Sequence, residues 1–167
     1  MKVYIGRYTD GKEPRKIDIR IDKWDTWGMD HTLALIILPM LKQLRDTKHG
    51  SSGRMPGFQQ TSNLGQSSFP FYAEGDDAAW EAGHKQWDEI MEKMIWSFEQ
   101  VLDDNWEDQY WIEKPKIDWE AMNNDAVSQE LVWKKRGVCD WDAREKHQER
   151  INEGLRLFGE YYEDLWD

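Results

Sequence analysis

A seam of large apolar side chains between residues 80 and 101 constrains the fold of this chain more than any other feature. The side chains recur at alternating steps of four and three residues, which is the spacing of one face of an α-helix. We therefore predict a helix over 77–102, with Asp76 or Asp77 as its N-cap. Such a face must be buried, so other helices have to pack against it. The residues of the seam are Trp80, His84, Trp87, Met91, Met94, Phe98 and Val101.

Two further segments predict helices that supply this cover. The first begins after Asp30, a common N-cap residue type, and runs to about Lys48. It is apolar nearly all round for most of its length, which predicts the central, buried helix, and Pro39 predicts a kink or break in the turn before it. The second begins near Asp142 and continues to the last residues with its own apolar stripe. That stripe consists of His147, Ile151, Leu155, Phe158, Tyr162 and Leu165.

The first 22 residues predict a β-hairpin. Ile17, Ile19 and Ile21 alternate strictly with charged residues, and a turn-forming Asp-Gly pair lies between the two strands. The apolar face of the hairpin must be covered, since an isolated hairpin is only marginally stable in water. Segment 109–135 contains short stretches that could add a third antiparallel strand. The predicted fold is therefore α+β, with the hairpin, or a three-stranded sheet, packed on three main helices.

The length of 167 residues fits one domain with a single hydrophobic core. We expect that domain to span residues 1–167, with a long flexible loop at 51–75 that is rich in Gly, Ser and Gln. A single cysteine, Cys139, excludes a disulfide within the chain. No apolar run approaches the roughly 20 residues of a membrane-spanning helix, and no signal-peptide pattern opens the sequence. We therefore expect an intracellular protein that does not associate with a membrane.

The net charge of −11 is concentrated in one part of the chain. Residues 73–130 hold 17 acidic and four basic side chains. Such a surface repels phosphates, so no direct nucleic-acid binding is expected. It could attract a protein partner with a basic surface, or it could mimic DNA and inhibit a DNA-binding protein. The alternative is that the charge only keeps the protein soluble.

Several of the 11 tryptophans lie near predicted element ends and, with neighbouring carboxylates, form the candidate interaction residues. Tryptophan is enriched among the residues that contribute most to protein interfaces, and carboxylates at an interface rim raise the association rate. The alternative is that these tryptophans pack over the protein's own small core. The candidates are Trp24, Trp27, Trp106, Glu107, Asp108, Trp111 and Glu113.

One helical face carries a candidate metal site. His84, Asp88 and Glu92 follow one another at steps of four residues, which stacks their side chains along the 77–102 helix. His147 of the last predicted helix could complete the ligand set. A divalent metal held there would support a hydrolase acting on nucleotides or nucleic acid; otherwise no cofactor is expected. The alternative is a structural histidine beside solvated carboxylates, because His84 also belongs to the apolar seam. No nucleotide-binding or protease motif occurs, so no catalytic residue is assigned.

Three stretches of the chain carry a family resemblance. They are WDTWGMDHTLA at 24–34 with PMLKQL at 39–44 and KHG at 48–50, MIWSFEQ at 94–100, and RLFG at 156–159 with the closing LWD. Together they resemble small acidic proteins, without an assigned activity, that are encoded in tailed-bacteriophage genomes. The resemblance implies a phage-encoded protein in the cytoplasm of the infected bacterial host. Small phage proteins without an assigned role are commonly modulators of host machinery, counter-defence factors or virion parts. We expect a non-enzymatic accessory role, in which the protein binds a host or phage macromolecule during host takeover or counter-defence.

Overall fold

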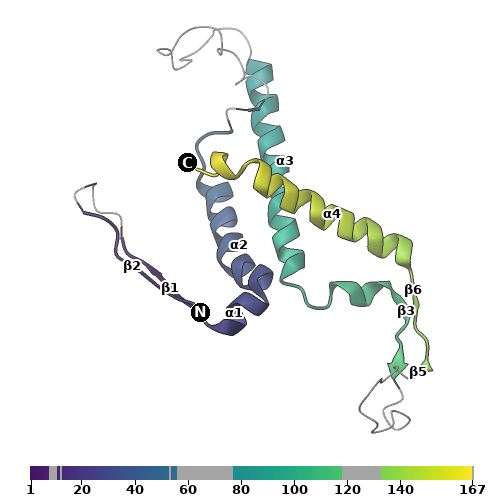
Figure 1. Cartoon of the computed structure of the whole chain (residues 1–167). Coiled ribbons are helices and arrows are strands. Elements are labelled where there is room, and N and C mark those ends of the chain that lie inside the picture. The colour runs from purple at the N-terminus through teal and green to yellow at the C-terminus, as the bar shows by residue number, and fades with distance from the viewer. Residues whose placement is uncertain (8–10, 12, 53, 56–76, 118–132, 167) are drawn as a thin grey trace.

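The computed structural model describes residues 1–7, 11, 13–52, 54–55, 77–117 and 133–166. Within these residues, three long helices pack together and short β-ribbons extend away from them (Figure 1). None of the described helices combines the length and the hydropathy that a membrane crossing needs.

The α+β class and the N-terminal hairpin are confirmed. The α-helices are α1 (Lys23–Trp27), α2 (Met29–Thr47), α3 (Asp77–Val101) and α4 (Trp141–Glu160), and the 3-10 helices are η1 (Trp106–Tyr110) and η2 (Tyr162–Asp164). The antiparallel strand pairs are β1 (Lys2–Ile5) with β2 (Ile17–Arg20), β3 (Trp111–Glu113) with β6 (Val138–Cys139), and β4 (Lys116–Ile117) with β5 (Trp133–Lys135).

The central helix of the bundle is α3, against which both α2 and α4 pack (Figure 1). Met91 and Met94 are fully buried, and Trp87 and Phe98 are nearly so. The predicted seam is therefore confirmed from Trp87 to Phe98. Trp80, which lies seven residues before Trp87, is 48% exposed. The buried core consists of Ala34, Leu41, Met55, Trp87, Ile90, Met91, Met94, Ile95, Phe98 and Leu157.

The helix predicted to be central and buried, α2, lies at the outside of the bundle. It buries Ala34 and Leu41, but Leu33 and Met40 are exposed. The reason is that α3 carries the larger side chains of a continuous seam and takes the position between α2 and α4. One side of α2 is enough to cover α3, which leaves the other apolar side uncovered.

Of the kink or break predicted in the turn before Pro39, the break does not occur, because α2 continues through Pro39 as one helix. Proline removes the hydrogen bond that would reach the carbonyl group of Leu35. Leu35 and Pro39 are both exposed, so water can hydrate that carbonyl group. The chain is interrupted instead at Gly28, between α1 and α2, and α1 begins with Asp22 and Asp25 in a capping box.

A close crossing of α3 and α4 closes the other side of the core. The N-cap of α4 is Asp140 and not Asp142, because the Asp140 side chain accepts a hydrogen bond from the backbone of the first turn. Gly154 lies at the crossing, where a Cβ atom would overlap the Ser97 hydroxyl group and the Lys93 carbonyl oxygen. The absence of a side chain at this position therefore lets the two helices approach.

The β1–β2 hairpin extends away from the helices (Figure 1). Val3 is paired with Ile19 and Ile5 with Ile17, so all four side chains lie on one face. These side chains are 39% to 63% exposed. The structure thus differs from the prediction in two respects: this face is not packed on the helices, and every sheet within the described residues has two strands, so the hairpin gains no third strand there.

Most of the loop predicted at 51–75 lies outside the described residues. Its first residues, however, are packed on the bundle. Met55 is 1% exposed and belongs to the core, and Ser52 is also buried. Arg54 forms an ion pair with Asp164 of η2, with 2.6 Å between Nη2 and Oδ2. The four described residues of the predicted loop, Ser51, Ser52, Arg54 and Met55, therefore lie against the bundle, and the flexible loop stays a prediction.

Candidate interaction surface

Two tryptophans on the short helix α1 are the most exposed of the candidate interaction residues. Trp24 is 65% exposed and Trp27 is 84% exposed. Their rings contact each other edge to face, with centroids 6.4 Å apart, and the Lys23 ammonium group lies 5.0 Å from the Trp24 ring. Because α1 buries none of its residues, both rings keep most of their apolar surface in contact with solvent.

Polar contacts hold α1 in place at its first turn. The Asp22 amide donates a hydrogen bond to Asp25, and the Trp24 amide donates one to Asp22. The N-terminal amine at Met1 also donates to Asp25, with 3.0 Å between the atoms. The Asp22 amide and the N-terminal amine lower the pKa of Asp25, because both stabilise its charged form. The start of the hairpin and the start of α1 are therefore joined at one carboxylate.

Exposed apolar side chains continue on both sides of α1. On one side lies the hairpin face, which consists of Val3, Ile5, Ile17 and Ile19. On the other side lies the outer α2 stripe, which consists of Met29, Leu33 and Met40. Steps of four and seven residues place these three side chains on one side of the helix, and they are 42% to 65% exposed. These exposed apolar side chains come from segments that follow one another along the chain, and exposed apolar patches mark interaction sites on many proteins.

The other two candidate tryptophans are half-buried against aromatic side chains of the same chain. Trp106 is half-buried and stacks on His147, with ring centroids 4.7 Å apart. Trp111 is also half-buried and contacts Trp141 edge to face, at 5.9 Å between centroids. Both rings therefore offer a partner less surface than Trp24 and Trp27 do, because other side chains of the chain cover part of them.

The three candidate carboxylates near η1 and β3 each pair with a cation of the chain. An exposed carboxylate paired in this way offers a partner less charge than the sequence suggests. The pairs are Glu107 with Arg144, Asp108 with Lys114 at 2.6 Å, and Glu113 with Lys135 at 2.8 Å.

His147 bridges α3, α4 and η1 through both of its ring nitrogens. Nδ1 lies 2.7 Å from the Tyr110 hydroxyl group and Nε2 lies 2.9 Å from Oε1 of Gln100. A neutral ring protonated at Nε2 satisfies both contacts, since Tyr110 then donates to Nδ1 and Nε2 donates to Gln100. Burial lowers the pKa of His147, and the nearby Arg150 charge lowers it further, while Asp103 opposes them.

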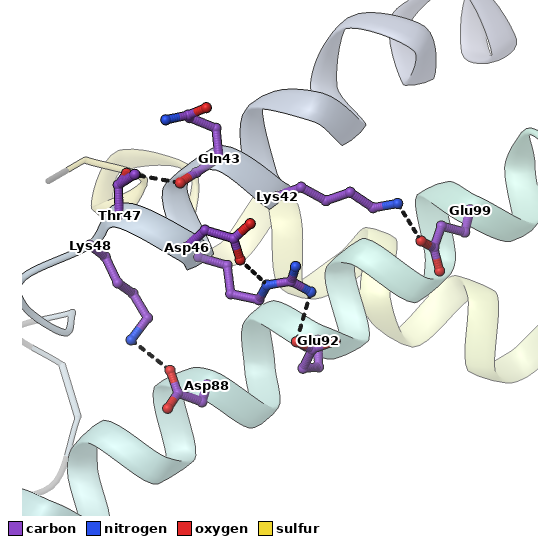
Figure 2. A network of polar contacts seen from close by, with 9 residues as sticks. Lys42, Gln43, Asp46, Thr47, Lys48, Asp88, Glu92 and Glu99 are labelled. Atoms are coloured by element: carbon purple, nitrogen blue, oxygen red, sulfur yellow. Dashed lines mark hydrogen bonds and ion pairs between the residues drawn. The ribbon is translucent and has the colours of Figure 1, made fainter.

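The four candidate metal ligands have separate partners. His84 Nδ1 lies 2.6 Å from the Ser51 hydroxyl group, and His147 has the two contacts described above. Asp88 and Glu92 point toward α2, where each meets a cation (Figure 2). In the part of the chain that the structure describes, no group of three or more His, Cys, Asp or Glu side chains is placed to hold a metal ion. The arrangement that the hydrolase hypothesis needs is therefore not found there.

The carboxylates of this α3 face form a ladder of ion pairs with α2, which the sequence reasoning missed (Figure 2). Lys42, Arg45 and the C-cap residue Lys48 follow one another at steps of three residues. This spacing places the three cations on one face of the helix, and it was the feature of the sequence that could have predicted the ion pairs. The pairs are Lys42 with Glu99 at 2.6 Å, Arg45 with Glu92 at 3.0 Å, and Lys48 with Asp88 at 2.6 Å.

Comparisons of this chain with protein-family models, with curated proteins and with solved structures gave no match. The resemblance to phage proteins therefore stays a prediction, and function has to be argued from the surface. Sequence reasoning selected Trp24 and Trp27, but it missed that the hairpin face and the outer α2 stripe would be exposed beside them. The apolar run around Pro39 could have predicted the exposed α2 stripe. Its apolar residues lie on more sides of the helix than one neighbouring helix can cover.

Proposed function

We propose that this chain is a phage-encoded accessory protein that acts by binding another protein in the cytoplasm of the infected bacterial host, without catalysing a reaction. The observation that carries the binding role is the Trp24–Trp27 pair, with 65% and 84% of the two side chains exposed. The phage origin, and with it the host cytoplasm, is supported by the resemblance of the sequence alone.

The geometry of α1 suits an interface anchor. A buried tryptophan removes about 150–250 Å² from water, and tryptophans dominate the energetics of many interfaces. The capping box and the ion pair between Met1 and Asp25 already order the backbone beneath the rings. Less conformational entropy is then lost when a partner binds, because the anchor is organised beforehand.

The proposed partner presents an apolar pocket to α1. A partner with a basic surface was expected from the acidic residues 73–130, but the candidate carboxylates Glu107, Asp108 and Glu113 are paired within the chain. The same pairing gives little support to DNA mimicry, which requires carboxylates free to replace phosphates. Both remain predictions from the sequence, and the apolar surface at α1 favours the protein-binding function.

The test is to compare Trp24→Ala/Trp27→Ala with a matched control, Trp166→Ala, which removes another exposed tryptophan of 73% exposure. Proteins captured by the wild type from a lysate of infected cells are identified, and their affinities for the wild type and the two variants are measured by calorimetry. We expect the double variant to bind about thirtyfold more weakly, as for the loss of about 2 kcal/mol at an interface hot spot. The control should bind like the wild type. Equal affinity of all variants would refute the proposal.

A further inference from the structure

We draw no further inference here: the strongest candidate, the exposed apolar face of the β1–β2 hairpin together with the outer α2 stripe, carries none because nothing in the described part of the structure shows what covers either surface.

Discussion

His147 joins α3, α4 and η1 through hydrogen bonds that depend on the protonation state of its ring. Its ring lies between Trp106 and Trp96, at 4.7 and 5.0 Å between centroids, and both nitrogens have partners. The surrounding aromatic rings shield part of the imidazole from water, and Arg150 adds a positive charge nearby. The folded protein therefore prefers the neutral ring, which is why the pKa of His147 lies below its usual value of 6.5.

The lowered pKa of His147 predicts a loss of stability under mildly acidic conditions. Because the unfolded chain binds the proton more readily than the folded protein, the contribution of His147 is complete above pH 6.5 and is lost as the pH falls below it. We expect the free energy of unfolding, measured by denaturant titration, to decrease between pH 7 and pH 5. The variant His147→Gln keeps hydrogen-bonding groups but cannot titrate.

The decrease should be smaller in His147→Gln than in the wild type. Hydrogen bonds and ion pairs lower the pKa values of Asp25 and Glu153. These two residues therefore affect the stability of the protein in a lower pH range than His147 does. Their stabilising contributions are present above their unfolded pKa values and are lost only as the pH falls through the lower, folded values. Equal slopes for the two proteins between pH 7 and pH 5 would contradict the role assigned to His147.

The packing of α3 with its two neighbours is achieved by different means on its two sides. Toward α2, a ladder of ion pairs lies over the apolar contact, and each pair is partly exposed (Figure 2). Pairs of this kind contribute roughly 0–1 kcal/mol each, so they serve register and orientation more than stability. Toward α4, the helices approach so closely at Gly154 that no side chain fits there.

The crossing of α3 and α4 predicts opposite effects for two glycines of the same helix. Gly154→Ala places a methyl group against Ser97 and the Lys93 carbonyl oxygen, so the helices must separate. We expect a loss of about 1–3 kcal/mol in the free energy of unfolding, as for overpacked cores. The matched control is Gly159→Ala, where a Cβ atom meets nothing within 4 Å.

The control should be neutral, or it should stabilise the protein by up to about 1 kcal/mol, because alanine favours the helix over glycine. Both variants are compared by denaturant titration under one set of conditions. If Gly154→Ala proved as stable as Gly159→Ala, the close crossing of α3 and α4 would not be present in solution.

At the scale of the molecule, the described residues form a helical bundle with short β-ribbons, and the N-terminal hairpin contributes no residue to the buried core described there. Every residue of the buried core comes from α2, α3 or α4, or is Met55. The hairpin is nevertheless ordered at its base through Asp25. Its stability and that of the bundle are therefore expected to be separable.

Removal of residues 1–20 tests this separation. We expect the shortened chain to keep its helical circular-dichroism signal and a denaturation midpoint close to that of the full chain, because the hairpin contributes no residue to the described buried core. Asp22 is retained, so the capping box of α1 remains. Loss of the helical signal would show that the hairpin supports the bundle directly, contrary to its position in the structure.

Local spacing in the sequence was sufficient to predict the N-terminal hairpin and the three long helices. The seam from Trp87 to Phe98 and the alternation of Ile17 and Ile19 each define one apolar face, because the helix and the strand repeat at fixed periods. The candidates Trp24 and Trp27 also followed from the sequence alone. Such spacing depends only on the geometry of neighbouring residues, so no tertiary information is needed to recognise it.

Tertiary structure decided which of these faces are covered. An apolar face must be buried, but its spacing does not state which element buries it, because the hydrophobic effect has no direction. Thus α3 took the centre that α2 was expected to take, and Asp88 and Glu92 met cations of α2 and not His147. The hairpin face was left exposed for the same reason: contacts between distant residues, and not local periods, determine where each surface lies.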